Sequence, residues 1–214
     1  MQTFLPDADF RRSAEVLDDR RLGKQRVEVI QIVRALTVPG YAWRHHPATL
    51  MWEGHEEALG AYGVAVVEAW RQRGFDDTCE ATIRADLAAA GVATLRDQQS
   101  LAEAGLLPPW LGDEALHRSH RSALVRKDPA HYRPLFPDVP DDLPYHWPVR
   151  SPNVLEAERR RAAAQVARQA RAVARLEAEA ERAAKRRSRA AKRAARTRAA
   201  NRLAAGRGDS ADGV

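Results

Sequence analysis

The sequence predicts an all-α protein: a compact bundle of about four helices with a proline-rich strap, followed by a long basic helical tail rich in alanine and arginine. Three observations support this. Apolar residues recur at helical spacings, no segment shows the alternation of a half-buried strand, and every Trp, Tyr and Phe precedes residue 154. The hydrophobic share of 44% in 214 residues is enough for one core, which we expect before residue 154.

Caps and breakers divide the front of the chain into helical segments. The periodicity predicts helices over residues 13–36, 48–73, 78–90, 113–127 and, as a short piece, 129–136. Ser13 is a candidate N-cap, and Gly74 and Gly91 stand where helices stop. Prolines then recur up to Asn153, which suits an extended strap over the helices.

The charges divide the chain at the same place. Residues 154–214 contain 17 Lys and Arg against 7 Asp and Glu, whereas residues 1–153 contain 18 against 22. We therefore expect a helical domain over residues 1–153 and, over residues 154–214, a basic tail that is helical or partly disordered and binds nucleic acid.

Within the tail, five arginines step by three and four and share one helical face: Arg182, Arg186, Arg189, Arg193 and Arg196. Such a face attracts phosphates without reading sequence. The alternative is a solubilising extension, and we expect "GRGDSADGV" at its end to be disordered.

Several protein classes are disfavoured. Cys79 is the single cysteine, so an intramolecular disulfide is excluded and a reducing compartment fits. The start "MQTFLPDADF" lacks the pattern of a secretion signal, and no apolar run is long enough for a membrane span. We expect a cytoplasmic monomer, associated with the nucleoid if the protein is bacterial.

The sequence "LDDRRLGKQRVE" places Arg20, Arg21, Lys24 and Arg26 ahead of Glu28. Two interpretations are open: a catalytic carboxylate on a nucleic-acid-binding surface, or a solvated helix face with internal salt bridges. Lys24 and Glu28 form an i,i+4 pair, and such pairs contribute only about 0.2 to 0.5 kcal/mol.

Amine chemistry has few candidates in the front domain, whose lysines are Lys24 and Lys127. An imine forms from an unprotonated amine, and a free lysine with a pKa of about 10.4 is almost fully charged at neutral pH. A free α-amino group, with a pKa of about 7.7 to 8.0, is not. The chain's own N-terminus is therefore the better candidate nucleophile.

Four stretches, "LDDRRLGKQRVE", "HHPATLMWEGHEEAL", "RQRGFDDT" and "SHRSALVRKDPAHY", resemble the phage-type pyrimidine dimer DNA glycosylases over about residues 17–132. These all-helical repair enzymes cut the glycosidic bond beside a UV-induced dimer and then nick the abasic strand. An N-terminal α-amine attacks the deoxyribose, and a glutamate of the first helix shuttles protons. The resemblance implies damaged or abasic DNA as the partner and requires no cofactor.

The same resemblance assigns roles to residues of this chain. Catalysis falls to Met1 and Glu28, with Lys24 as the alternative amine. Nucleic-acid contacts fall to Arg20, Arg21, Arg26, Arg118, Arg121, Arg126, Lys127 and Tyr132 and, in the tail, to Arg186, Arg189 and Arg193. Tyr132 and Trp110 suit stacking on an exposed base, although burial in the core is the commoner fate of such residues.

One departure from the family concerns the N-terminus. The phage enzyme has a threonine behind its initiator methionine and uses the amine freed by methionine removal, whereas this chain has the bulkier Gln2, so we expect Met1 to stay. Two other functions remain open: a DNA- or RNA-binding module that has lost the chemistry, and a metal-dependent hydrolase that uses His117, His120 and His131.

Overall fold

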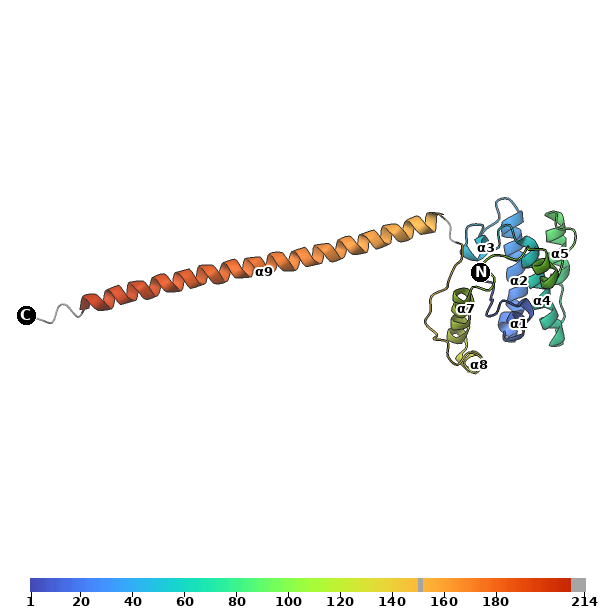
Figure 1. The fold of residues 1–214 in the computed structure, drawn as a ribbon, viewed down its shortest axis with the longest axis horizontal. Helices are drawn as coiled ribbons and strands as arrows, with labels where there is room; N and C mark the ends of the chain where they lie inside the picture. Colours follow the sequence, from blue (N-terminus) through green and yellow to red (C-terminus); the bar gives the residue numbers. More distant parts are fainter. Residues whose placement is uncertain (150–151, 209–214) are drawn as a thin grey trace, which may run out of the picture. The chain divides into compact units, whose positions relative to one another are not determined.

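The computed structural model describes residues 1–149 and 152–208, and every regular element in these ranges is an α-helix (Figure 1). The all-α prediction is therefore confirmed. The chain divides into two compact units, Met1–Val154 and Leu155–Val214.

The first unit is built around a pair of packed helices, α2 and α4. Its elements are α1 (Phe10–Glu15), α2 (Asp19–Thr37), α3 (Pro47–Leu50), α4 (Glu56–Gln72), α5 (Cys79–Ala89), α6 (Gln98–Glu103), α7 (Glu114–Lys127) and α8 (Pro129–Tyr132). α1 and α6 pack on α4, α5 packs on both central helices, and α8 packs on α7. The chain from residue 137 to residue 149 contains no helix, as expected for the strap.

The first predicted helix, residues 13–36, is in fact two helices. Asp18 caps α2, because its side chain accepts a hydrogen bond from the Arg21 N–H, and α1 has ended before it. Ser13 lies inside α1, where its hydroxyl donates to the Asp7 carbonyl at 2.8 Å. Periodicity alone missed this break because the apolar spacing continues across it.

The second predicted helix, residues 48–73, is also interrupted. α3 ends at Leu50, and the chain turns through Gly54, whose φ of +79° suits glycine, before α4 begins. Helix α6 was not predicted, since its six residues are too few for a periodic pattern, and it begins where Asp97 accepts a hydrogen bond from the Ser100 N–H.

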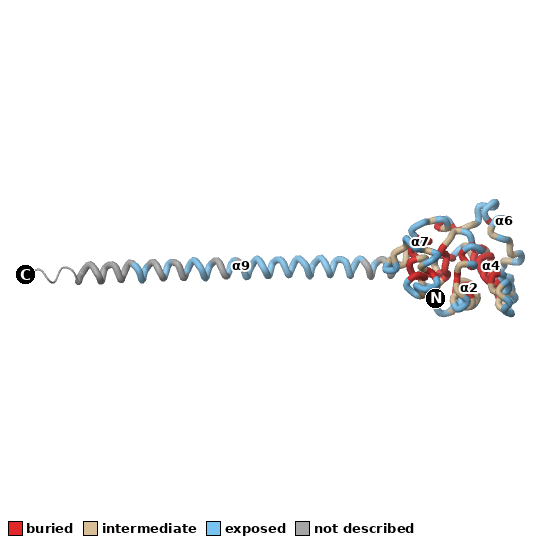
Figure 2. Tube along the Cα trace, turned by 90° about the horizontal axis from the view of Figure 1, so that it is seen from below, coloured by how far each residue is buried: buried red, intermediate tan, exposed pale blue. Residues whose placement is uncertain are grey.

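The N-terminal segment, residues 1–8, contains no helix, and it is hydrogen-bonded to α2, α4 and α7; the N label in Figure 1 marks its start. Phe4 N–H donates to Gln25 Oε1 of α2 at 2.8 Å, and Leu5 N–H donates to His120 Nδ1 of α7 at 2.9 Å. The Phe4 carbonyl accepts from the Tyr62 hydroxyl of α4 at 2.9 Å. This segment therefore belongs to the core, whose buried residues gather around α2, α4 and α7 (Figure 2).

The second unit is described as one helix, α9 (Pro152–Gly208). All of its described side chains, from Glu156 to Arg198, are exposed (Figure 2). The start of the expected disordered end, residues 206–208, lies in this helix, and residues 209–214 fall outside the described residues. None of the helices described combines the length and the apolar character of a membrane span.

Candidate active site

Glu28 lies on the face of α2 that meets the N-terminal segment, and only 4% of its surface is exposed. Its Oε2 atom accepts a hydrogen bond from the Gln2 N–H at 3.2 Å and lies 3.8 Å from the α-ammonium nitrogen of Met1. Its Oε1 atom lies 3.3 Å from Lys24 Nζ. One carboxylate therefore stands beside both amines that the sequence indicated as nucleophiles.

Packing and hydrogen bonds fix the Met1 amine in this position. The Met1 side chain is buried, and the Thr49 hydroxyl donates to its Sδ atom at 3.4 Å. Gln25 Nε2 donates to the Gln2 carbonyl at 3.0 Å, and Trp52 Nε1 donates to the Thr3 hydroxyl at 3.1 Å. Because successive residues are tied to the core, the amine is preorganised rather than free at the end of a mobile arm.

His120 secures Gln2 from the side of α7. Burial first, and then the neighbouring His117 and His146, lower the pKa of His120 to about 3, so its ring is neutral at physiological pH. Since Nδ1 accepts from the Leu5 N–H, the proton is on Nε2, 2.8 Å from the side-chain amide of Gln2. That tautomer requires the amide to present its oxygen to the ring. Gln2, the residue that departs from the family pattern, is thus held in place by hydrogen bonds to α2 and α7.

The amine and the carboxylate face a cavity of about 510 Å³, which we call the N-terminal cavity. It is lined by Met1, Gln2, Phe4, Arg20, Arg21, Lys24, Gln25, Glu28, His46, Lys127, Tyr145 and Trp147. Four cationic side chains surround one carboxylate, which makes the cavity attractive to a phosphate-bearing ligand.

The electrostatics of the cavity disfavour the protonated forms of two of its groups, Lys127 and His46. Partial burial, and then the charges of Arg21, Arg126 and Lys24, lower the pKa of Lys127. Burial, and then the positive Met1 amine, lower the pKa of His46 against the opposing effect of Glu28. An anion entering the cavity would relieve the repulsion among these groups.

The cavity unites Met1 with most of the site residues predicted in the first helix, namely Arg20, Arg21, Lys24 and Glu28, and with Lys127 from α7. Arg21 is partly committed elsewhere, because its guanidinium lies 2.5 Å from Asp18 and 3.6 Å from Asp128. Arg20 and Lys24 are exposed, so they are the freer cations at this cavity.

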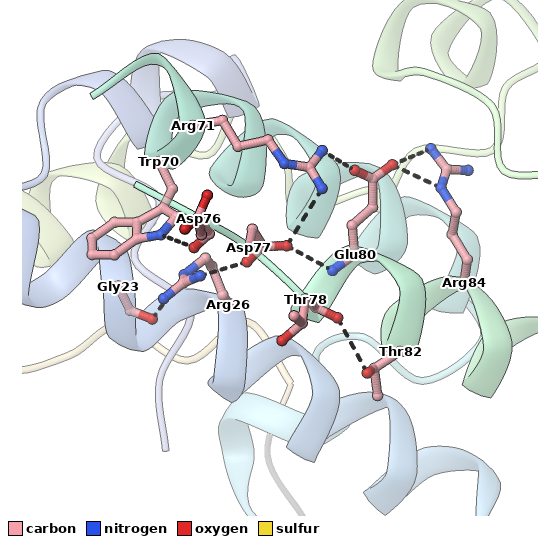
Figure 3. A network of polar contacts seen from close by, with 10 residues as sticks. All are labelled: Gly23, Arg26, Trp70, Arg71, Asp76, Asp77, Thr78, Glu80, Thr82 and Arg84. Carbon is pink, nitrogen blue, oxygen red and sulfur yellow. Dashed lines mark hydrogen bonds and ion pairs between the residues drawn. The ribbon is translucent and has the colours of Figure 1, made fainter. Parts of the chain in front are cut away.

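Arg26 lies outside the cavity, in a network that joins α2, α4 and the start of α5 (Figure 3). Its guanidinium donates to Asp77 Oδ2 at 2.5 Å and lies 4.1 Å from the centre of the Trp70 ring. Burial raises the pKa of Asp77, but the Glu80 N–H and the Arg26 guanidinium lower it by more, so the net pKa is below its ordinary value. In this arrangement Arg26 and the "RQRGFDDT" stretch link α2, α4 and the start of α5.

The cations predicted on α7 are also dispersed. Arg121 donates to the Pro6 carbonyl at 2.9 Å and pairs with Glu114, and Arg126 donates to the Asp141 carbonyl of the strap at 2.9 Å. Arg118 is exposed at a separate cavity of about 450 Å³. These three residues therefore do not join the N-terminal cavity, whereas Lys127 does.

The aromatic residues expected to stack on a base are in the core. Tyr132 has no exposed surface, and its hydroxyl donates to Asp18 Oδ2 at 2.5 Å. Trp110 is 7% exposed and donates to the Met51 carbonyl at 2.7 Å. Neither ring offers a face to a base in this structure, which corrects the expected stacking role. The exposed Trp43 was missed, although its loop, "YAWRHHP", mixes aromatic and basic residues as nucleic-acid-binding loops do.

The histidines on α7 are occupied by the N-terminal segment. His117 Nδ1 lies 2.8 Å from the Leu5 carbonyl, while His117 Nε2 accepts from the Gly112 N–H at 3.0 Å. Across the described ranges, no three His, Cys, Asp or Glu side chains gather as metal ligands would. His117 and His120 therefore hold the N-terminal segment in place.

Residues 1–83 match the family model of pyrimidine dimer DNA glycosylase. The resemblance to this family is therefore confirmed over the N-terminal segment, α1 to α4 and the start of α5. The matched region contains Met1, Lys24 and Glu28. Comparisons with curated proteins and with solved structures gave no match.

Proposed function

We propose that this protein is a DNA repair glycosylase with abasic-site lyase activity, which acts on damaged DNA through an imine on its N-terminal amine. The observation that carries the proposal is the Met1 amine, fixed 3.8 Å from the buried Glu28 carboxylate in a cavity lined by cations. The match of residues 1–83 to the pyrimidine dimer DNA glycosylase family supports it.

The proposed chemistry begins with the unprotonated Met1 amine attacking the C1′ carbon of the damaged nucleotide. The N–C1′ bond forms as the bond between C1′ and the base breaks, and the sugar ring opens to an imine. Glu28 accepts the proton that the amine loses and can return it to the ring oxygen. The base leaves as an anion and takes a proton from water. Water then removes a C2′ proton, a C2′–C3′ double bond forms as the C3′–O bond to the phosphate breaks, and hydrolysis of the imine frees the amine.

Cations of the cavity are proposed to hold the strand during these steps. Arg20 and Lys24 are exposed at its rim, and Lys127 approaches from α7. Contacts of this kind position a strand through its phosphates and carry no sequence information. The lesion would then be selected by what enters the cavity.

Met1 is the favoured nucleophile because its position is fixed, whereas Lys24 has 70% of its side chain exposed. The proposal requires Met1 to be the first residue of the active protein, which an intact-mass measurement checks. Gln2 N lies closer to Glu28 than the Met1 amine does, so loss of Met1 would still leave an amine at the site.

Borohydride trapping tests the proposal. The protein is incubated with a duplex that contains an abasic site, the imine is reduced, and the adduct is mapped by mass spectrometry, with Lys24→Arg and Lys127→Arg as matched variants. We expect an adduct on the Met1 amine in all three proteins, and also in the presence of a chelator, since imine chemistry needs no metal.

If the adduct disappears in Lys24→Arg, the imine reaction still occurs in the wild type, but its nucleophile is Lys24 and not Met1. DNA binding without any adduct would instead favour the alternative function, a non-catalytic DNA- or RNA-binding module on the same scaffold.

We further propose that α9 tethers the protein to nucleic acid. Its exposed cations include Arg186, Arg189 and Arg193, which share one helical face. A tether raises the effective concentration of the first unit near DNA without a specific contact. Unchanged DNA affinity in a protein that ends at Val154 would contradict this role.

A further inference from the structure

The loop between α2 and α3 carries an aromatic side chain that is unusually exposed. Trp43 has 58% of its surface accessible, the largest fraction of any Trp, Tyr or Phe in the described ranges. Its backbone φ is +71°, in the left-handed region that non-glycine residues rarely adopt. Core packing therefore does not explain this tryptophan, and backbone preference opposes it.

Trp43 is joined to the N-terminal cavity by a series of aromatic rings. Its ring packs edge to face on His46, with 5.7 Å between centroids, and His46 packs in the same way on Trp147 at 5.9 Å. Trp147 in turn contacts Tyr145 at 5.5 Å. His46, Tyr145 and Trp147 all line the cavity, so Trp43 extends an aromatic rim outward from it.

The rim is held rigidly by its histidine. His46 caps α3, and its Nδ1 atom accepts a hydrogen bond from the Ala48 N–H at 3.1 Å. This bond fixes the ring plane against which Trp43 packs, and the lowered pKa of His46 keeps the ring uncharged. A preorganised apolar surface of this kind suits a flat aromatic ligand.

The charges around the rim define the ligand further. Arg44 and His45 are exposed next to Trp43 in the chain, and Arg20 and Lys24 are exposed at the cavity. A flat ring attached to phosphates matches both features, and single-stranded nucleic acid combines them.

We propose that Trp43, supported by His46 and Trp147, stacks on an unstacked nucleobase of the DNA strand whose sugar enters the N-terminal cavity. This inference rests on the proposed function. It implies that the protein distinguishes damaged from intact DNA by the exposed face of an unstacked base. In an intact duplex every base is stacked on its neighbours, so the rim would find a free base face only at a disrupted step.

The test is binding to a duplex with a tetrahydrofuran abasic analogue, which cannot form an imine, compared with the same duplex fully paired. Wild type should bind the analogue duplex more tightly. Trp43→Gly removes the ring and suits the positive φ, so the protein should stay folded and lose about tenfold in affinity for the analogue duplex. Its affinity for the paired duplex should change by less than about twofold.

Further variants separate the ring from apolar bulk. Trp43→Phe keeps an aromatic face and should retain most of the preference, whereas Trp43→Leu should behave like Trp43→Gly. Phe75→Leu is the matched control, since Phe75 is exposed but stacked on Trp70 and does not line the cavity.

Equal losses on both duplexes in Trp43→Gly, or unchanged affinity on both, would overturn the stacking role. Absence of any wild-type preference for the analogue duplex would do the same. Because no imine can form on this analogue, these results are independent of borohydride trapping, so failure of the lyase chemistry and failure of the rim can be told apart.

Discussion

The two units of this chain use positive charge in opposite ways. In Met1–Val154 most of the cations discussed above are held by carboxylates or carbonyls, and a few gather at a cavity beside Glu28. In α9 the stretch from Arg182 to Arg198 contains nine Lys and Arg and no Asp or Glu, and its described side chains are exposed. The first unit thus holds its cations in fixed positions and has no excess of positive charge. Helix α9 has an excess of positive charge on side chains that are not held in fixed positions.

The two units therefore suit different tasks: the first unit suits catalysis, and α9 suits attraction to phosphates. Proton transfer and imine formation require groups held within a few ångströms of each other, which a packed core can supply. Attraction to phosphates requires only charge density, which an exposed helix supplies.

The largest effect is expected from Glu28→Gln, which preserves the shape of the side chain and removes its charge. Strand cleavage should fall by about 100-fold or more, because a positioned acid or base contributes at least that much, while DNA affinity stays within about twofold. Single-turnover cleavage and equilibrium binding measure the two quantities. Glu68→Gln, at an exposed position on α4, should cleave normally. Parallel loss of cleavage and binding would point to misfolding, and normal cleavage would remove Glu28 from the mechanism.

The next effect contrasts two ion pairs. Asp77→Ala leaves Arg26 without its carboxylate in the packed network, and we expect a loss of about 3 kcal/mol in the free energy of unfolding. Glu179→Ala removes the exposed partner of Arg175 in α9 and should change nothing measurable. Urea unfolding followed by tryptophan fluorescence gives the first value, and circular dichroism, which also reports on α9, gives the second. A similar small effect for both variants would show that the Arg26 network is not structural and return Arg26 to the candidates for DNA contact.

Acid should weaken the first unit and spare α9. The pKa of His120 is about 3 in the folded protein and 6.5 in the unfolded chain. Below pH 6.5 the unfolded chain therefore binds a proton at His120 that the folded protein does not bind. Stability is therefore complete above that pH and is lost as the pH falls, by about 2 kcal/mol at pH ~5, and the lowered pKa of His46 acts in the same direction.

Urea midpoints at neutral and mildly acid pH, read from tryptophan fluorescence, measure this loss, because every tryptophan precedes residue 154. His120→Gln should reduce the pH dependence. Helix α9 contains no histidine, so its helical circular dichroism should not change over this range. A midpoint that is independent of pH would contradict the buried neutral state of His120.

The smallest effect is expected from the arginine face of α9. Replacing Arg182, Arg186, Arg189, Arg193 and Arg196 by glutamine should weaken DNA binding about tenfold at low salt. It should also reduce the slope of log affinity against log salt by up to about 0.9 for each phosphate that the helix no longer neutralises. Cleavage of saturating DNA should be unchanged. Replacing Glu177, Glu179 and Glu181 by glutamine is the control of opposite sign and should strengthen binding. An unchanged salt slope in the arginine variant would leave α9 as a solubilising extension.

Local features of the fold were predictable because they depend on neighbouring residues. Gly91 stops α5 near its predicted end, and Asp113 caps α7 at its predicted start. The breaks at Asp18 and Gly54 were missed, because a cap or a turn inside a continuous apolar pattern does not change the periodicity. Whether Ser13 or Asp18 caps a helix depends on the residues that pack around each of them.

The candidate site was predictable in composition and not in arrangement. The charge pattern and the resemblance identified Glu28, Lys24 and Met1, but no local rule distinguishes Arg20, which stays exposed, from Arg26, which pairs with the distant Asp77. For the same reason no local rule decided between stacking and burial for Tyr132, since its partner Asp18 is far away in the chain.

By itself the sequence determined the helical class, the change of charge near residue 154 and the cationic character of α9, because periodicity and charge are properties of short segments. Only the tertiary structure decided that the N-terminal segment lies between α2 and α7, with the Met1 amine beside Glu28 and Trp43 exposed outside the cavity. Those placements result from contacts between residues far apart in the chain, and such contacts exist only once the core has packed.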